Sequence, residues 1–156
     1  MALQSVINTE YSVGIAGDPV NPTEVVYTAI NPIAETDVTV GNFVFKGTDP
    51  LSQVKNTGST VAGLAVRVQT YPNYTITSAG SLVAPAGEGI SIAVKGYFYA
   101  KSATVATAGQ AIFASTTDGS IKTGTAGGTV SGCVETSFKV LKGGAVGEII
   151  IIGNWE

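Results

Sequence analysis

The residues from Gly87 to Thr123 alternate between apolar and polar side chains more regularly than any other part of the chain. Successive side chains of a strand point to opposite faces, so the alternation predicts a strand with one buried face and one face toward solvent or a partner. Gly96 interrupts the apolar row, and glycine inside a strand is typical of a bend or bulge. We therefore expect one long, bent strand. Its apolar parity holds Ile90, Ile92, Val94 and Phe98, and its other parity holds Ser91, Ala93, Lys95, Tyr97, Tyr99 and Lys101.

A second strand is predicted at Gln110–Ser115, and Ile121–Thr123 returns after the turn sequence Thr116–Ser120. Asp118 and Gly119 stand at the centre of that turn. An Asp-Gly pair between apolar runs is a strong hairpin signal, because both residues tolerate positive φ. The sequence therefore predicts a β-hairpin here.

Short strands recur along the rest of the chain, separated by turn sequences rich in Gly, Pro and Asp, and no ten-residue stretch has helical spacing with caps. Gly41 predicts a bulge inside one of these strands, and Leu51–Thr60 reads as a loop. This pattern predicts an all-β fold, either a small antiparallel β-barrel or a jelly-roll-like sandwich. The predicted strands are Glu24–Ile30, Val38–Lys46, Val61–Tyr71, Tyr74–Thr77, Leu82–Ala84, Val130–Leu141 and Glu148–Ile152.

The chain has 156 residues, which predicts a single domain. We expect residues 1–22 to form an extended N-terminal arm and residues 23–156 to form the barrel or sandwich. The arm ends in the turn sequences Gly17–Pro19 and Asn21–Pro22. Its apolar residues can dock either on the arm's own domain or on a neighbouring molecule, and both alternatives stay open. They are Leu3, Val6, Ile7, Val13 and Ile15.

The composition excludes several classes of function. The chain has no histidine, which removes the commonest general base and metal ligand. Charged residues make up 12%, the net charge is −3 and Arg67 is the sole arginine, so we expect no nucleic-acid binding. No run of 18 apolar residues and no secretory signal are present, and we expect no membrane span and no cofactor.

The remaining reactive side chains have structural explanations. Asp18, Asp49 and Asp118 all stand in turn sequences, where a carboxylate caps its own backbone. A pair of glycosidase carboxylates would be the catalytic alternative, but no spacing singles one out. Cys133 is the sole cysteine, so no intrachain disulfide can form, and we expect it to be a small buried apolar residue rather than a reactive thiol. We therefore predict that the chain is not an enzyme.

Tyr97 and Tyr99, interleaved with Lys95 and Lys101, form the one stripe of interest on the other face of the predicted strand. Such interleaving could stack single-stranded nucleic acid, but the anionic chain disfavours it. Two alternatives stay open. The stripe is either a second buried face of a sandwich or a protein-binding surface, since tyrosine offers a large contact area at low entropic cost.

Several sequence segments, taken in order, resemble the structural cement, or capsid decoration, proteins of tailed bacteriophage heads. These segments cover most of the chain and consist of turn and strand patterns. They are Gly17–Pro19, Thr39–Phe43, Gly87–Phe98, Ala108–Phe113, Asp118–Thr123 and Ile151–Trp155.

The resemblance implies a virion protein on the outer surface of the expanded head that bridges neighbouring major capsid protein subunits. It implies a dimer or trimer and no enzymatic activity. The alternative is a carbohydrate-binding β-sandwich or virion adhesin, which would present aromatic platforms. The candidates for such platforms are Tyr71, Tyr74, Tyr97, Tyr99 and Trp155.

Overall fold

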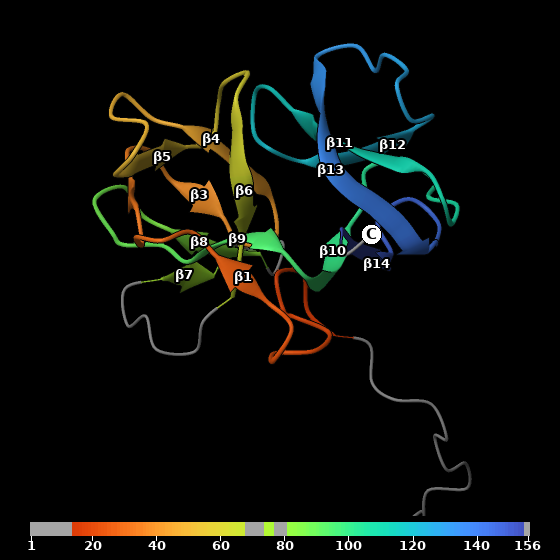
Figure 1. Cartoon of the computed structure of the whole chain (residues 1–156), viewed down its shortest axis with the longest axis horizontal. Coiled ribbons are helices and arrows are strands. Elements are labelled where there is room, and N and C mark those ends of the chain that lie inside the picture. Colours follow the sequence, from red (N-terminus) through yellow and green to blue (C-terminus); the bar gives the residue numbers. More distant parts are fainter. Residues whose placement is uncertain (1–13, 68–73, 77–80, 155–156) are drawn as a thin grey trace, which may run out of the picture.

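The computed structural model describes residues 14–67, 74–76 and 81–154, which form two groups of strands lying side by side (Figure 1). Residues 97–153 supply the whole of a five-stranded antiparallel sheet, called sheet A here. Its strand order is β10-β14-β13-β11-β12. The strands are β10 (Tyr97–Lys101), β11 (Ala111–Ser115), β12 (Ile121–Gly124), β13 (Cys133–Lys142) and β14 (Ile149–Gly153).

Residues 26–95 supply two further sheets. Sheet B has six strands in the order β1-β9-β6-β4-β5-β2, and sheet C has three in the order β3-β8-β7. The strands of sheet B are β1 (Val26–Tyr27), β2 (Ile33–Ala34), β4 (Phe43–Lys46), β5 (Gln53–Lys55), β6 (Val61–Ala65) and β9 (Ile92–Lys95). Those of sheet C are β3 (Val38–Thr39), β7 (Thr75–Ile76) and β8 (Leu82–Ala84).

Sheets A and B both curl toward closure. In sheet B, β2 pairs with β5 in parallel, and Ile33 also forms a bridge with Gly89, just before β9. In sheet A, Ser102 follows β10 and forms a bridge with Ile121 of β12. The return in sheet A joins its two end strands, and the return in sheet B brings the end strand β2 beside the residues that precede β9, the neighbour of β1. The all-β prediction is therefore confirmed, with two curled sheets.

Two clusters of buried side chains fill the molecule. The smaller one lies on one face of sheet B and against sheet C, and includes Val44, Ala65 and Ile92. The larger one lies between the opposite face of sheet B and sheet A. Phe138 of β13 is central to it, since its ring contacts Phe43 and Phe98 with centroids 5.4 and 6.3 Å away. One core therefore joins residues from both halves of the chain.

The stretch Ile90–Lys101 differs from the single bent strand that its alternation predicts. Gly96, with φ of +140°, divides it into β9 of sheet B and β10 of sheet A. Asn154 holds this crossing, because its side chain accepts a hydrogen bond from Gly96 N and donates one to Val94 O. Both parities are buried at the start of β9 and just before it, at Ile90, Ser91, Ile92 and Ala93, whereas Val94 is half-buried and Lys95 is exposed.

Gly41 likewise divides the predicted strand Val38–Lys46 into two strands that belong to different sheets. Its φ is +90°, and the chain passes there from β3 of sheet C to β4 of sheet B. A side chain at this position would press against Ala16, with 2.9 Å to its carbonyl carbon. The glycine that the sequence assigns to a bulge is therefore a crossing between sheets.

The predicted Asp-Gly hairpin is confirmed between β11 and β12. Its tip contacts sheet B, because Phe43 N donates a hydrogen bond to Gly119 O and Asn42 Nδ2 donates one to Asp118 O. A Cβ at Gly119 would collide with the carbonyl oxygen of Phe43. The hairpin therefore links the two halves as well as reversing the chain.

Several predicted segments have different bounds in the structure. Val61–Tyr71 forms a strand at Val61–Ala65, which ends before Val66 and Arg67, and residues 68–71 lie outside the described residues. Glu24–Ile30 forms a strand only at Val26–Tyr27, and the predicted loop Leu51–Thr60 contains β5. The predicted strand Val130–Leu141 is found at Cys133–Lys142, with a register shift where it pairs with β11. The described residues contain no helix with the length and hydropathy that a membrane span requires.

Candidate interaction surface

The end of the predicted arm lies against the outer edge of β10. Gly17 N and Val20 N donate hydrogen bonds to the carbonyl oxygens of Tyr99 and Tyr97, and Tyr99 N donates one to Asp18 O. Residues 17–20 therefore act as an additional edge strand of sheet A. This placement matches docking of these residues on their own chain, and it covers an edge that could otherwise pair with another molecule.

The same segment is tied to sheet B. Arg67 N, just beyond β6, donates a hydrogen bond to Gly17 O, and the Arg67 guanidinium pairs with Asp18 at 3.2 Å. Both side chains are partly exposed, so the ion pair contributes less than about 1 kcal/mol to stability. Asp18, which the sequence assigns to a turn, also ties the N-terminal segment to the end of β6.

Tyr97 and Tyr99 lie on β10 and are half-buried against their own chain. Tyr97 stands opposite Gly153 of β14, and its ring fills the space over that glycine. The ring of Tyr99 covers Gly14 in the same manner. Part of each tyrosine is therefore used in intramolecular packing, and part remains accessible.

A groove of about 380 Å³ lies beside the N-terminal segment. Its floor and walls come from six separated parts of the chain: the N-terminal segment, the residue after β3, the segment just beyond β6, the β7–β8 region, the end of β10 and the start of β14. Ile15 and Ile76 are respectively 53% and 76% exposed at its rim. Arg67 and Lys101 supply its two cations, and its remaining lining includes Gly14, Ala16, Val40, Leu82 and Ile149.

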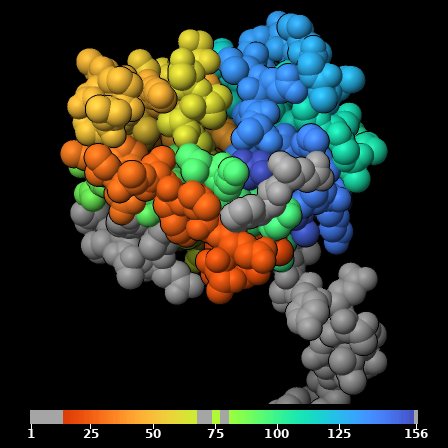
Figure 2. All heavy atoms as spheres, in the orientation of Figure 1, coloured from red at the N-terminus to blue at the C-terminus, as the bar shows by residue number. Residues whose placement is uncertain are grey.

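A second apolar feature follows the segment between residues 20 and 33. Residues 14–35, coloured red to orange, cross the face of the molecule that is shown in Figure 2. Five large apolar side chains are exposed between residues 20 and 33, and such a concentration of apolar surface is typical of an interaction site. They are Val20, Val26, Tyr27, Ile30 and Ile33, and they are called the apolar row below.

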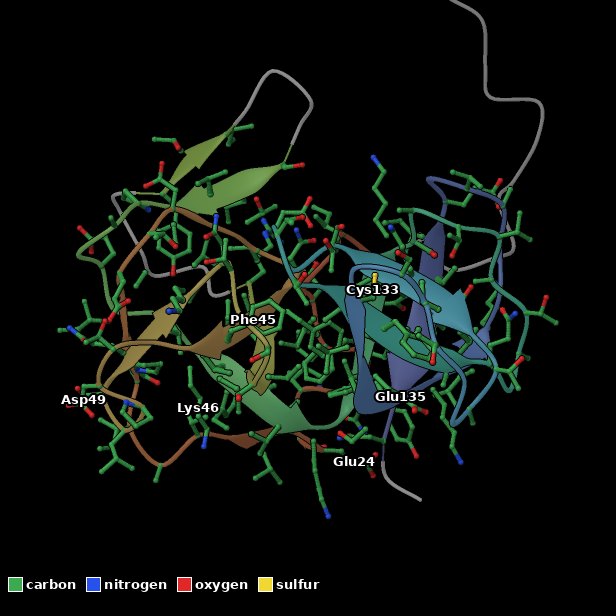
Figure 3. All side chains as sticks on the ribbon, turned by 90° about the horizontal axis from the view of Figure 1, so that it is seen from above. Glu24, Phe45, Lys46, Asp49, Cys133 and Glu135 are labelled. Carbon is green, nitrogen blue, oxygen red and sulfur yellow. The ribbon has the colours of Figure 1, made fainter. Side chains whose placement is uncertain are left out.

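Within the described residues the carboxylates do not form a metal-binding group. Asp49 lies at the opposite end of the molecule from Glu24 and Glu135 in Figure 3, and no group of three metal-ligating side chains occurs in this part of the chain. Asp49 accepts hydrogen bonds from Ser52 Oγ and Leu51 N, and these lower the pKa of its carboxyl. Cys133 is partly exposed rather than buried, at the start of β13.

Asp118 shows the balance between burial and hydrogen bonding at the hairpin. Partial burial acts to raise the pKa of its carboxyl, but hydrogen bonds from Ser120 and Ser115 and the positive charge of Lys122 together outweigh it, so that the pKa lies below the ordinary value. The turn roles that the sequence assigns to Asp49 and Asp118 are thus visible in their bonds.

The structure brings Ile15, Tyr97 and Tyr99 into one region around the N-terminal segment. The other predicted interface residues, Leu3, Val6, Ile7 and Val13, lie outside the described residues. The sequence does not reveal the groove, because its lining residues are scattered from Gly14 to Ile149. Within the apolar row, only the β-branched residues near Val26 stand out in the sequence, where they predict a strand.

Comparison with known proteins identifies the class. The family model described as "Structural cement protein (E217 gp24/Pam3 gp6)" matches residues 3–154. The chain belongs to this family of structural cement proteins, whose members are phage capsid proteins with a stabilising role.

The fold agrees with that assignment. A chain in the solved structure titled "The capsid of Myoviridae Phage XM1" is similar, with a TM-score of 0.62 and 14% sequence identity. The similarity covers 98% of this chain and 97% of the other. A search of curated protein sequences gave no match.

Proposed function

We propose that the protein binds the outer surface of the expanded phage head and bridges neighbouring major capsid protein subunits as a dimer or trimer. The observation that carries this proposal is the family match over residues 3–154. A cement protein stabilises a shell by adding contact area at the joints between subunits. Its work depends on shape and stiffness, and it needs no reactive group, so we propose no catalytic activity.

The architecture supports a stiff connecting role. A buried core joins the two halves of the chain, and Asn154 and the Asp118–Gly119 hairpin connect the same halves through hydrogen bonds. Both outer edges of sheet A are occupied, β10 by residues 17–20 and β12 by residues that include Ala103. Covered edges limit unwanted strand pairing, which matters for a protein that crowds on a shell in many copies.

We assign the contact with the major capsid protein to the apolar row. Its five exposed apolar side chains lie on one continuous segment, and apolar residues are concentrated at the cores of protein interfaces. The arm residues Leu3, Val6, Ile7, Val13 and Ile15, with Tyr97 and Tyr99, form the second proposed interface region.

The test is co-sedimentation of the purified chain with expanded, undecorated heads and with unexpanded proheads of the same phage. We expect saturable binding to expanded heads alone, at a copy number that matches lattice positions. Binding to one state only stabilises that state by mass action. Equal binding to both forms, or no binding, would contradict the proposal, and a glycan screen would then test the carbohydrate-binding alternative.

Variants sharpen the assignment of the contact. Ile30→Asp places a charge in the apolar row, and we expect head affinity to fall at least tenfold. Leu51→Asp is the matched control, since Leu51 is 81% exposed in the turn before β5 and lies outside the row. Unchanged affinity of the Ile30→Asp protein would remove the row from the contact.

A further inference from the structure

The groove beside the N-terminal segment has the chemistry of a docking site for an apolar peptide with one negative charge. Its rim exposes Ile15 and Ile76, and Leu82 and Ile149 continue the apolar lining. Arg67 is paired with Asp18, whereas Lys101 has no ion-pair partner within the described part of the chain. A segment that fills this groove would cover the isoleucines and bring a carboxylate to Lys101.

Residues 1–13 of this same sequence have that chemistry. They include the apolar residues Leu3, Val6, Ile7 and Val13, and Glu10 is their sole charged side chain. This segment joins the described chain at Gly14, which itself lines the groove. We propose that residues 1–13 of one copy occupy the groove of a second copy, with Glu10 facing Lys101. The inference rests on the self-association proposed above.

The position of residue 14 favours a second copy over the arm's own groove. Residues 14–16 form one wall of the groove, so an arm filling its own groove would have to reverse direction directly at that wall. Glu10–Val13 (EYSV) contains no Gly, Pro, Asn or Asp, and Ser12 is its one residue of a type that favours such a reversal.

Length also permits the exchange. Thirteen extended residues reach about 43–47 Å, against a radius of gyration of about 15 Å for a compact chain of this size. The arm is therefore long enough to cross onto a neighbour. If each copy gives an arm and receives one, the exchange generates a closed and symmetric contact.

Charge reversal gives the sharpest test. Glu10→Lys and Lys101→Glu should each weaken self-association of the full chain about tenfold, measured by sedimentation equilibrium, because each copy then presents two like charges to its neighbour. The two variants mixed in equal amounts should associate as strongly as the wild type, since every contact between unlike copies is matched again. An arm held in its own groove would give no such recovery on mixing.

Ile76→Asp should also weaken self-association, because it places a charge at the apolar rim, and Leu51→Asp serves as the control that should not. A monomeric wild-type chain, or a mixture that stays as weakly associated as its components, would overturn the inference. Head binding is measured separately by co-sedimentation. A monomer that still binds expanded heads would refute the arm exchange alone, and a dimer that binds no heads would refute only the proposed function.

Discussion

The two halves of the molecule reach similar curled shapes by different means. The strands of sheet A pair only in the antiparallel sense and have four to ten residues, and the sole parallel contact in this sheet is the single bridge between Ser102 and Ile121. Sheets B and C use strands of two to five residues and include the parallel pair β2–β5. Backbone ladders therefore account for most of the order in sheet A, whereas sheets B and C need other support.

Side chains supply that support in the first half. Glu35 accepts a hydrogen bond from Thr48 N, Asp37 accepts one from Ala86 N, and Thr36 Oγ1 accepts one from Asn56 N. Such bonds satisfy backbone groups that a longer strand would pair. The comparison indicates that sheets B and C depend on their turns and on contact with sheet A.

The largest loss of stability is expected from a substitution in the core that joins the two halves of the chain. Phe138→Ala removes a buried ring that packs against Phe43 from β4 and Phe98 from β10. Deletion of a buried phenylalanine typically lowers the free energy of unfolding by about 3–5 kcal/mol. Denaturant unfolding followed by two probes should show one transition for the wild type. Val146→Ala, at an exposed position, should change the stability little.

The hairpin tip provides a second connection between the halves. Gly119→Ala forces a side chain into a position with φ of +70° and against the carbonyl oxygen of Phe43. We expect a loss of about 2 kcal/mol or more, which combines backbone strain with displacement of β4.

Gly127→Ala is the matched control for the hairpin variant. Gly127 has φ of +72°, and no atom lies within 4 Å of the added Cβ. The Gly127→Ala protein should therefore lose only the free energy of backbone strain, about 1–2 kcal/mol. Equal losses in the two variants would mean that the hairpin tip does not stabilise its contact with sheet B.

Asn154 tests the crossing at Gly96. Asn154→Ala leaves Gly96 N and Val94 O without their side-chain partner, which should cost about 1–3 kcal/mol. Asn154→Asp keeps an acceptor for Gly96 N but sets a carboxylate oxygen against Val94 O, where two acceptors repel, and so should destabilise at least as much as Asn154→Ala. Thermal unfolding measures the stability of both variants. An Asn154→Ala protein that melts at the wild-type temperature would show that the Asn154 hydrogen bonds do not stabilise the crossing at Gly96.

The smallest expected effect is on the stability of the folded chain at acid pH. The pKa of Asp118 in the folded chain lies below its ordinary value of 3.8, so its contribution to stability is complete above that pH and is lost as the pH falls through the folded pKa. Stability should therefore decline below about pH 4. Asp118→Asn should flatten part of this decline, and an unchanged acid profile would contradict the role of the Ser120 hydrogen bonds.

Local patterns in the sequence predict individual strands and turns well. The hairpin at Asp118–Gly119 and the short strands β7 and β8 follow from turn residues and alternation alone. The crossings at Gly41 and Gly96 do not, because a glycine that bends a strand and one that transfers it to another sheet look alike in sequence. Which outcome occurs depends on distant contacts, such as that of Asn154 with Val94 and Gly96.

The same limit applies to the surface. Alternation placed Tyr97 and Tyr99 on one parity, but it could not show that Gly153 and Gly14 lie beneath their rings. The groove is assembled from residues more than a hundred positions apart, so no local pattern marks it. The sequence predicts only that Ile15 docks on its own domain or on a neighbour, and the exposure of Ile15 and Ile76 is seen only in the folded structure.

The central claim is that this protein stabilises a phage head. The most direct measurement is the temperature at which DNA-filled heads release their DNA, for heads stripped of the protein and for the same heads after it is added back. The account predicts a higher release temperature after addition, which saturates at the same copy number as binding. Full occupancy with no change in the release temperature would contradict it.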